Sequence, residues 1–181
     1  MYFSSLSAAR IAAAPLSRIS NLTRAEVRAL TPAQIRGFTA RQLSVLPRDL
    51  LGRLTIAQLQ GLAPEALAAM TPYAFAFSPY QIAAFTVAQM AAITPSTAAH
   101  LDAASLSGLN ANQIAALAPE TLAAATPAAL SGVSAAAMSG LTPSQISQLG
   151  AEQLAAFSPA QAAVLAAAVR RGVATGGRLA A

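Results

Sequence analysis

The stretch LTPAQIRGFTARQLSV (Leu30–Val45) contains nearly the same eight-residue phrase twice. We number the positions of this unit 1 to 8, with Leu30 and Phe38 both at position 1. Counted in both directions, the pattern gives twenty units over residues 6–164, one of which, at 70–76, has only seven residues. A short fixed period of this kind predicts a repeat architecture in which neighbouring units stack on one another.

Each position of the unit keeps its own residue type. Positions 1 and 6 are large and apolar in eighteen of the twenty units, and position 2 is Ser, Thr, Asp or Asn in fifteen. Nine of the eleven prolines stand at position 3, and Gln stands at position 5 in nine units. Positions 7 and 8 are mostly Ala, Ser or Gly. Every recurring feature therefore belongs to one local pattern.

That pattern predicts the start of a helix. In Thr31-Pro32-Ala33-Gln34, the Thr hydroxyl can accept from the backbone N–H three residues on, while the Gln side chain reaches back to the Thr N–H. Proline supplies the helical φ at a place where its missing N–H is not needed. Positions 1 and 6 then form the hydrophobic staple that flanks such a cap.

The next proline or cap follows so soon that each unit holds only about a turn and a half of helix. Helices this short persist only when neighbours bury their staples. We therefore predict an all-α fold, a narrow α-solenoid of about twenty very short capped helices with positions 1 and 6 as its core. A β-solenoid is the structural alternative, although Ala, Gln and frequent Pro disfavour strands.

The repeat predicts three segments. Residues 1–5 form an N-terminal lead, residues 6–164 form the solenoid with its shortened unit at 70–76, and residues 165–181 form a helix end and a flexible basic tail. Arg170-Arg171-Gly172 is interpreted as that helix end, and a basic contact segment is the alternative. The glycines fall late in their units, which is typical of helix ends.

Positive charge gathers near the N-terminus. The net charge is +5, all eleven basic residues are Arg, and eight of them precede residue 54. These eight are Arg10, Arg18, Arg24, Arg28, Arg36, Arg41, Arg48 and Arg53. An asymmetric basic end can attract nucleic acid, anionic lipid or an acidic partner, whereas scattered Arg can also be an ordinary solvated face. Arg24, Arg28, Arg36 and Arg41 are the candidate contact residues.

Five of the nine aromatic residues fall between residues 73 and 85, around the shortened unit. Bulky rings that fill a disturbed stack explain this cluster, and an exposed patch for a partner protein is the alternative. Tyr73 and Tyr80 both occupy position 4, which we expect to face outward, so they are candidate partner-binding residues.

The residues offer little chemistry. The chain has no Cys and one His, His100, so thiolate and multi-histidine metal sites are excluded and no cofactor is expected. The four acids of the central region stand in separate units and form no recognisable carboxylate pair. No apolar run is long enough to span a bilayer, and no cleavable secretory signal is evident. We therefore expect a protein that is not an enzyme.

Two phrases carry a resemblance to known proteins. Leu30–Ile35 and Leu141–Ile146 are similar to the helix start of repeats in transcription activator-like effectors, without their base-reading residues. The whole array, about 160 residues, resembles tandem octapeptide repeats of bacterial surface or adhesin-like proteins. That resemblance implies a bacterial protein, cytoplasmic or secreted to the surface, with no active site. The abundance of Ala, Gly and Pro, with Arg used in place of Lys, also suggests a GC-rich bacterial genome.

These observations leave three functional hypotheses. We expect a non-catalytic repeat scaffold or spacer that binds a partner protein or associates with itself. The alternative is a nucleic-acid-binding protein that uses the Arg-rich N-terminal third. An enzyme is the third hypothesis, and no sequence motif supports it.

Overall fold

The computed structural model describes residues 3–70 and 77–176, and all regular structure within them is helical. The predicted α-solenoid is confirmed, and the β-solenoid alternative is wrong for the described part of the chain. The chain forms two compact units, Met1–Ile93 and Thr94–Ala181. The shortened unit at 70–76 lies, apart from Met70, outside the described residues.

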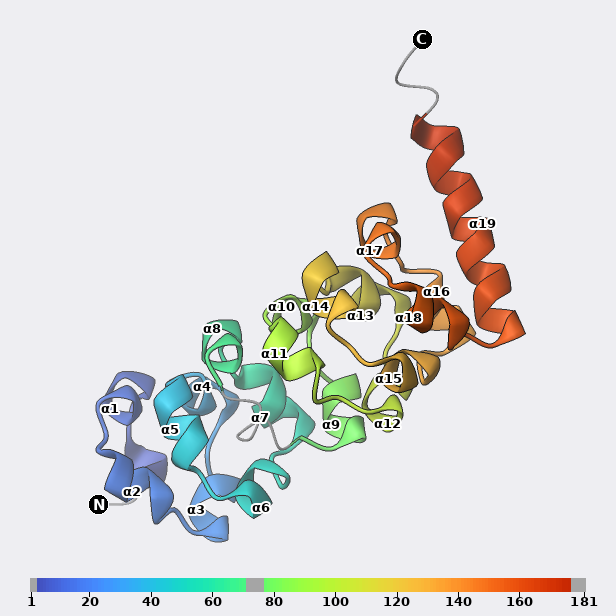
Figure 1. The fold of residues 1–181 in the computed structure, drawn as a ribbon. Coiled ribbons are helices and arrows are strands. Elements are labelled where there is room, and N and C mark those ends of the chain that lie inside the picture. The colour runs from blue at the N-terminus through green and yellow to red at the C-terminus, as the bar shows by residue number, and fades with distance from the viewer. Residues whose placement is uncertain (1–2, 71–76, 177–181) are drawn as a thin grey trace. The chain divides into compact units, whose positions relative to one another are not determined.

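Short helices succeed one another at intervals of eight residues (Figure 1). The first compact unit contains η1 (Phe3–Ser5), α1 (Ala8–Ala12), α2 (Leu16–Ser20), α3 (Arg24–Arg28), α4 (Pro32–Ile35), α5 (Ala40–Val45), α6 (Arg48–Leu51), α7 (Ile56–Gly61), α8 (Pro64–Ala68), α9 (Pro79–Ala83) and α10 (Val87–Ala91). The second contains α11 (Pro95–Ala98), α12 (Ala103–Ser107), α13 (Ala111–Ala116), α14 (Pro119–Ala123), α15 (Pro127–Ser131), α16 (Ala135–Met138), α17 (Pro143–Ser147), α18 (Ala151–Ala155) and α19 (Pro159–Gly176).

The predicted capping box begins α4. The Thr31 hydroxyl accepts from the Gln34 N–H at 3.2 Å, and Gln34 Oε1 accepts from the Thr31 N–H at 2.9 Å. The same reciprocal pair begins α3, α5, α7, α9, α10, α13 and α17. Both bonds satisfy N–H groups that a helix start leaves without intrahelical partners.

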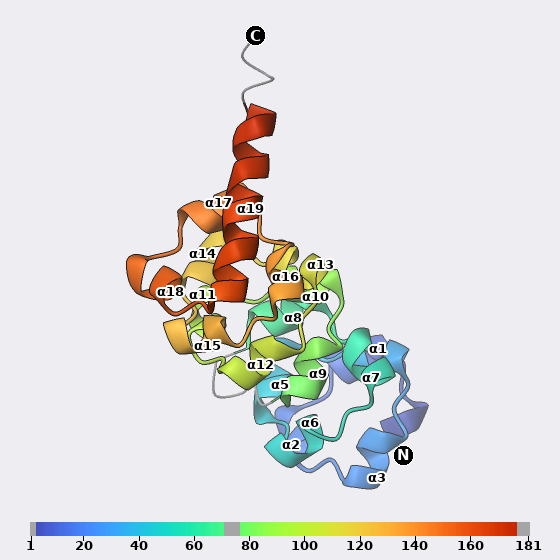
Figure 2. The ribbon, with the colours of Figure 1, turned by 90° about the vertical axis from the view of Figure 1, so that its right-hand side faces the viewer.

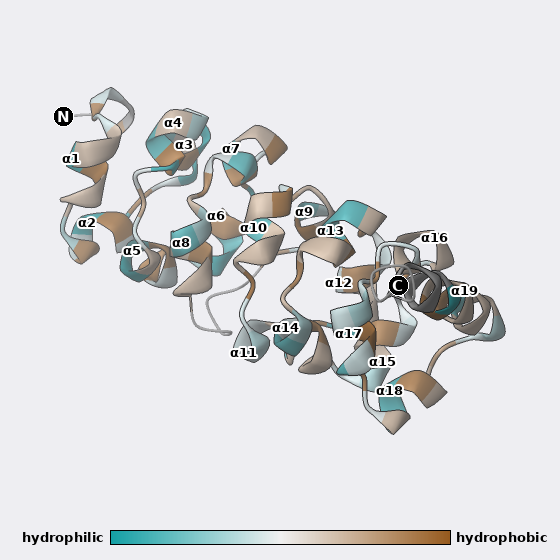
Figure 3. Cartoon of the chain, turned by 90° about the horizontal axis from the view of Figure 1, so that it is seen from above, coloured by the Kyte–Doolittle hydropathy of each residue, from teal (hydrophilic) through white to brown (hydrophobic). Residues whose placement is uncertain are grey.

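Positions 1 and 6 form the core, as the repeat predicts. Ile11, Leu59 and Ile114, all at position 6, are fully buried. Leu154, at position 6 of α18, is an exception and is exposed. Position 5 is buried as well in every described unit from α5 onward, although it mostly carries a polar residue. Hydrophobic and hydrophilic residues accordingly alternate within single short helices (Figure 3).

Helices pack against the helix three repeat units away. The closely packed pairs of this kind are α1–α4, α2–α5, α4–α7, α5–α8 and α8–α10 in the first compact unit, and α11–α14, α12–α15, α13–α16, α14–α17, α15–α18 and α16–α19 in the second. One turn of each stack therefore takes three repeat units, and successive helices lie in three separate columns.

The last helix departs from the prediction. The sequence places a helix end at Arg170–Gly172, but α19 continues without a break to Gly176 and is much longer than the others (Figure 2). No proline follows Pro159, and the Ala-rich sequence favours helix throughout, so nothing interrupts it. The predicted tail at residues 177–181 lies outside the described residues.

Candidate partner-binding surface

The buried residue at position 5 has two partners. Gln58 Oε1 accepts from the Thr55 N–H at 3.0 Å, which completes the cap of α7. Its Nε2 donates to the carbonyl oxygens of Val27 and Leu30, at 2.9 and 2.8 Å. One amide therefore caps its own helix and also bonds to the preceding turn of the stack.

We call the side chains that do this the glutamine ladder. Its members are Gln34, Gln42, Gln58, Gln81, Gln89, Gln145, Gln153 and Gln161. Gln145 reaches back 31 and 28 residues, as Gln58 does. Gln81 and Gln89, whose bonds span the seven-residue unit, reach back 30 and 27. Each amide therefore bonds to a carbonyl group of the unit three repeats earlier, whether or not a seven-residue unit lies between them.

Glu26 stands at position 5 without a ladder bond, because a carboxylate has no N–H to donate to a carbonyl oxygen. Its carboxylate accepts from the Thr23 N–H at 3.0 Å and from Arg18 at 2.7 Å. The hydrogen bond from the Thr23 backbone, with those of the Thr23 hydroxyl and Arg18, lowers the pKa of Glu26 despite some burial. A carboxylate is thus an adequate cap here, whereas a ladder position needs the amide donor.

Several glycines lie at helix ends, as predicted, and some also allow close packing between turns. Gly52, Gly108 and Gly132 are the C-caps of α6, α12 and α15, and no glycine among the described residues has a positive φ. A Cβ on Gly61 would lie 2.5 Å from the Pro32 carbonyl oxygen, and one on Gly140 would overlap the Ala111 backbone. Gly52, by contrast, has its nearest neighbour at 3.6 Å. Gly61 and Gly140 are therefore required by the third-neighbour packing.

Position 4 faces solvent. It is exposed in every described unit, and it carries Ala, Ser, Arg, Asp, Glu, Tyr or Asn. Tyr80, for which we predicted an outward orientation, is 71% exposed on α9. Tyr73 lies outside the described residues. Arg41, Glu65 and Asn112 occupy the same outward position on other helices.

The other aromatics near Tyr80 serve packing. Phe77 and Phe85 are buried and meet edge to face, with ring centroids 5.3 Å apart. The packing explanation holds for these two rings, and the exposed tyrosine is not part of it.

The four candidate arginines do not share one surface. Arg24 and Arg28 lie on α3 and line a cleft of about 340 Å³ with Arg53. Arg36 ends α4 and lines a different groove, and Arg41 is exposed on α5. Because α3, α4 and α5 follow one another within a single turn, they belong to three different columns. Sequence reasoning did not select Arg53, which only the stacking of α6 on α3 brings to the cleft.

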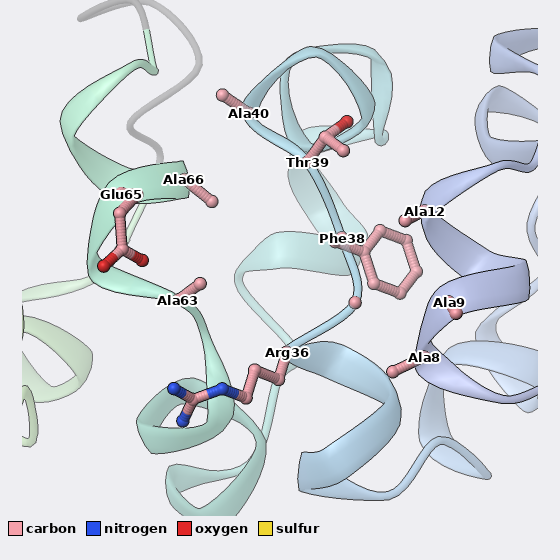
Figure 4. A pocket seen from close by; sticks show the side chains of 11 residues that line it. Ala8, Ala9, Ala12, Arg36, Phe38, Thr39, Ala40, Ala63, Glu65 and Ala66 are labelled. Atoms are coloured by element: carbon pink, nitrogen blue, oxygen red, sulfur yellow. The ribbon is translucent and has the colours of Figure 1, made fainter.

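The groove beside Arg36 is lined mainly by alanines. It has a volume of about 550 Å³ and runs between α1, the loop at 36–40 and the start of α8. Figure 4 shows Phe38 directed toward Ala9 and Ala12 on one side, with Arg36 and Glu65 on the other. Its walls carry no group suited to acid–base or metal chemistry beyond this one charged pair.

The described residues offer no grouping of acids and histidine able to hold a metal ion. His100 is exposed, and its Nδ1 lies 2.9 Å from the Ser96 carbonyl oxygen. Asp102 is the N-cap of α12, and hydrogen bonds from the Ser105 hydroxyl and N–H lower the pKa of its carboxyl. Both residues thus have local structural partners.

Within the described part of the chain, no helix combines the length and the apolarity needed to cross a membrane. Comparison of the chain with protein-family models, with curated proteins and with solved structures gives no match.

Proposed function

We propose that this protein is a non-catalytic repeat scaffold that binds a partner protein, or a second copy of itself, through the side chains at position 4. The observation that carries the proposal is the division of labour within the unit. Positions 1 and 6 are mostly buried, position 5 is buried from α5 onward and position 2 caps most helices, whereas position 4 is exposed throughout the described chain. Varied side chains held at fixed intervals on a packed stack are the usual recognition surface of repeat proteins.

The hydrogen bonding of the buried polar groups supports the same proposal. Every buried side-chain nitrogen and oxygen in the described residues has a hydrogen-bond partner. Active sites generally hold polar groups in perturbed or unsatisfied settings. A bacterial origin is part of this proposal, with the protein either cytoplasmic or secreted to the cell surface.

The test uses the full chain immobilised as wild type and as the triple variant Arg41→Ala, Glu65→Ala and Tyr80→Ala. Alanine is the commonest residue at position 4, so circular dichroism should stay unchanged. A matched control replaces three exposed serines at position 7, Ser44, Ser107 and Ser147, with alanine. We expect a bound protein, or self-association seen by light scattering, that the control keeps and the triple variant loses. Identical retention by all three chains, or none by any, would overturn the proposal.

Nucleic-acid binding is the second candidate, favoured by the eight Arg that precede residue 54. Its affinity would come from phosphate contacts, so log K should fall by about 0.9 per phosphate neutralised as log salt rises. Little sequence preference is expected, because phosphate contacts position a protein without specifying a site. Replacing Arg24, Arg28, Arg36 and Arg41 with Gln should abolish it. Titration of duplex and single-stranded DNA at two salt concentrations decides, and we expect no binding at physiological salt.

A further inference from the structure

A cleft of about 340 Å³ lies between α3 and α6 in the first compact unit. Its rim carries Arg24, Arg28, Arg53 and Thr55, and its floor is formed by Val27 and Leu50, both almost fully buried. Figures 1 and 2 show α3 and α6 side by side. The pair is nevertheless absent from the closely packed third neighbours, unlike α1–α4, α2–α5 and α4–α7.

Helix α6 departs from the repeat pattern at two positions beside this cleft. Position 5 is Leu50 instead of Gln, so α6 lacks the amide that would bond to the carbonyl groups 28 and 31 residues earlier. Its N-cap is Pro47, which has no side-chain hydrogen bond to offer. Helix α6 therefore lacks both the position-5 amide and the side-chain cap, and the apolar Leu50 side chain lines the cleft instead.

The cleft also concentrates unneutralised positive charge. Arg24 pairs with Asp49 at 3.3 Å, where both side chains are more than half exposed. Within the described residues, no carboxylate lies within ion-pair distance of Arg28 or Arg53. Three guanidinium groups around one small cleft repel one another unless an anion neutralises them.

We propose that the α3–α6 cleft binds an acidic segment of a partner protein, whose carboxylates accept hydrogen bonds from Arg24, Arg28 and Arg53. The planar guanidinium fork matches a carboxylate with two parallel hydrogen bonds. The methylene groups of Glu or Asp side chains pack on the Val27 and Leu50 floor. This inference rests on the proposed scaffold function and names the chemistry of one partner contact.

Two observations favour an acidic protein segment over nucleic acid. The floor is apolar, which suits aliphatic side-chain stems and gives nothing to a phosphate backbone. Arg36 and Arg41 lie on other helices of the turn, so the cleft provides only three guanidinium groups close together. Nucleic-acid grooves instead extend basic side chains along many phosphates.

The experiment measures fluorescence anisotropy of a labelled twelve-residue Asp/Glu-rich peptide with the full chain at low and at physiological salt. The test variant combines Arg28→Gln and Arg53→Gln, and the control combines Arg10→Gln and Arg170→Gln, which remove the same charge from the exposed surfaces of other helices. We expect the cleft variant to bind roughly fivefold more weakly, the scale of two exposed charge pairs, and the control less than twofold. Unchanged circular dichroism shows that both variants fold.

Equal weakening by both variants would show attraction to net charge alone and would overturn the cleft assignment. So would tighter binding of a twelve-nucleotide single strand that the control variant abolishes, because that outcome places nucleic acid on the other arginines. A negative result for the cleft is distinguishable from a negative result for the scaffold proposal. The capture experiment replaces residues at position 4, whereas Arg28 and Arg53 stand at positions 7 and 8.

Discussion

Replacing Gln58 with Glu tests the glutamine ladder with almost no change of shape. The carboxylate keeps an oxygen for the Thr55 cap, as Glu26 does in its own helix. It replaces the Nε2 donor with an oxygen facing the Val27 and Leu30 carbonyls, which lie 2.9 and 2.8 Å from the amide nitrogen. Two attractive contacts thus become repulsive at a site that is 3% exposed.

The expected cost follows from these contacts. Two buried hydrogen bonds contribute about 0.5–1.5 kcal/mol each, and an unpaired buried charge adds a larger penalty, so we expect roughly 3–5 kcal/mol at pH 7. Gln58→Ala, which loses the same bonds without adding charge, should cost roughly 2–3 kcal/mol. Urea unfolding followed by circular dichroism gives both values.

The Gln58→Glu cost should also depend on pH. Burial beside two carbonyl oxygens raises the pKa of the new carboxyl in the folded state. A group whose pKa is raised on folding contributes stability at low pH and loses it as the pH rises through the folded-state value. The difference from wild type should therefore shrink as the pH falls, when the acid can again donate one hydrogen bond.

Gln148→Glu provides the matched control, since Gln148 is exposed and undergoes the same chemical change. It should shift the free energy of unfolding by less than about 0.5 kcal/mol. An equal effect at residues 58 and 148, or a cost at 58 that ignores pH, would refute the reasoning.

Three further predictions test the packing, the core and the caps. Gly61→Ala should lower the free energy of unfolding by roughly 1–3 kcal/mol, since its Cβ would lie 2.5 Å from a backbone oxygen 29 residues earlier. Gly52→Ala should be neutral or stabilising, and urea unfolding of both variants compares them. Ile114→Ala removes a fully buried side chain and should cost roughly 2–4 kcal/mol, against about 1 kcal/mol for the lost cap in Thr142→Ala; equal, negligible values would contradict the unit's assigned roles. The pKa of Asp102 is lowered from 3.8, so its cap contributes stability above that pH and loses it as the pH falls further; Asp102→Asn keeps a cap and should remove this loss in acid unfolding curves.

The single helix could be predicted from the sequence because its signals are local. Thr31, Pro32 and Gln34 define a cap within four residues, and positions 1 and 6 give the staple. The three-unit turn could not be predicted in the same way, because it depends on contacts between residues about 28 apart. One feature of the sequence is consistent with the three-unit turn. The charged residues at position 5 are Arg10, Arg18 and Glu26, and all three lie in the first three units.

The candidate surface was predictable only in part. Exposure of Tyr80 follows from its place in the unit, which faces away from the staple. The cleft could not be predicted from one unit, because Arg28 and Arg53 are 25 residues apart and only the folded stack brings them to the same cleft. The place of the glycines at helix ends was predictable, whereas the close approach at Gly61 and Gly140 was not, because it depends on residues 29 places earlier.

The third-neighbour glutamine ladder is tested most directly by nuclear magnetic resonance of the side-chain amides. In the wild-type protein, the Nε2 protons of Gln58 should show cross-peaks to protons of Leu30, 28 residues earlier, and exchange with solvent much more slowly than those of exposed Gln148. Cross-peaks from Gln58 confined to its own unit, with exchange as fast as at Gln148, would contradict the three-unit stack.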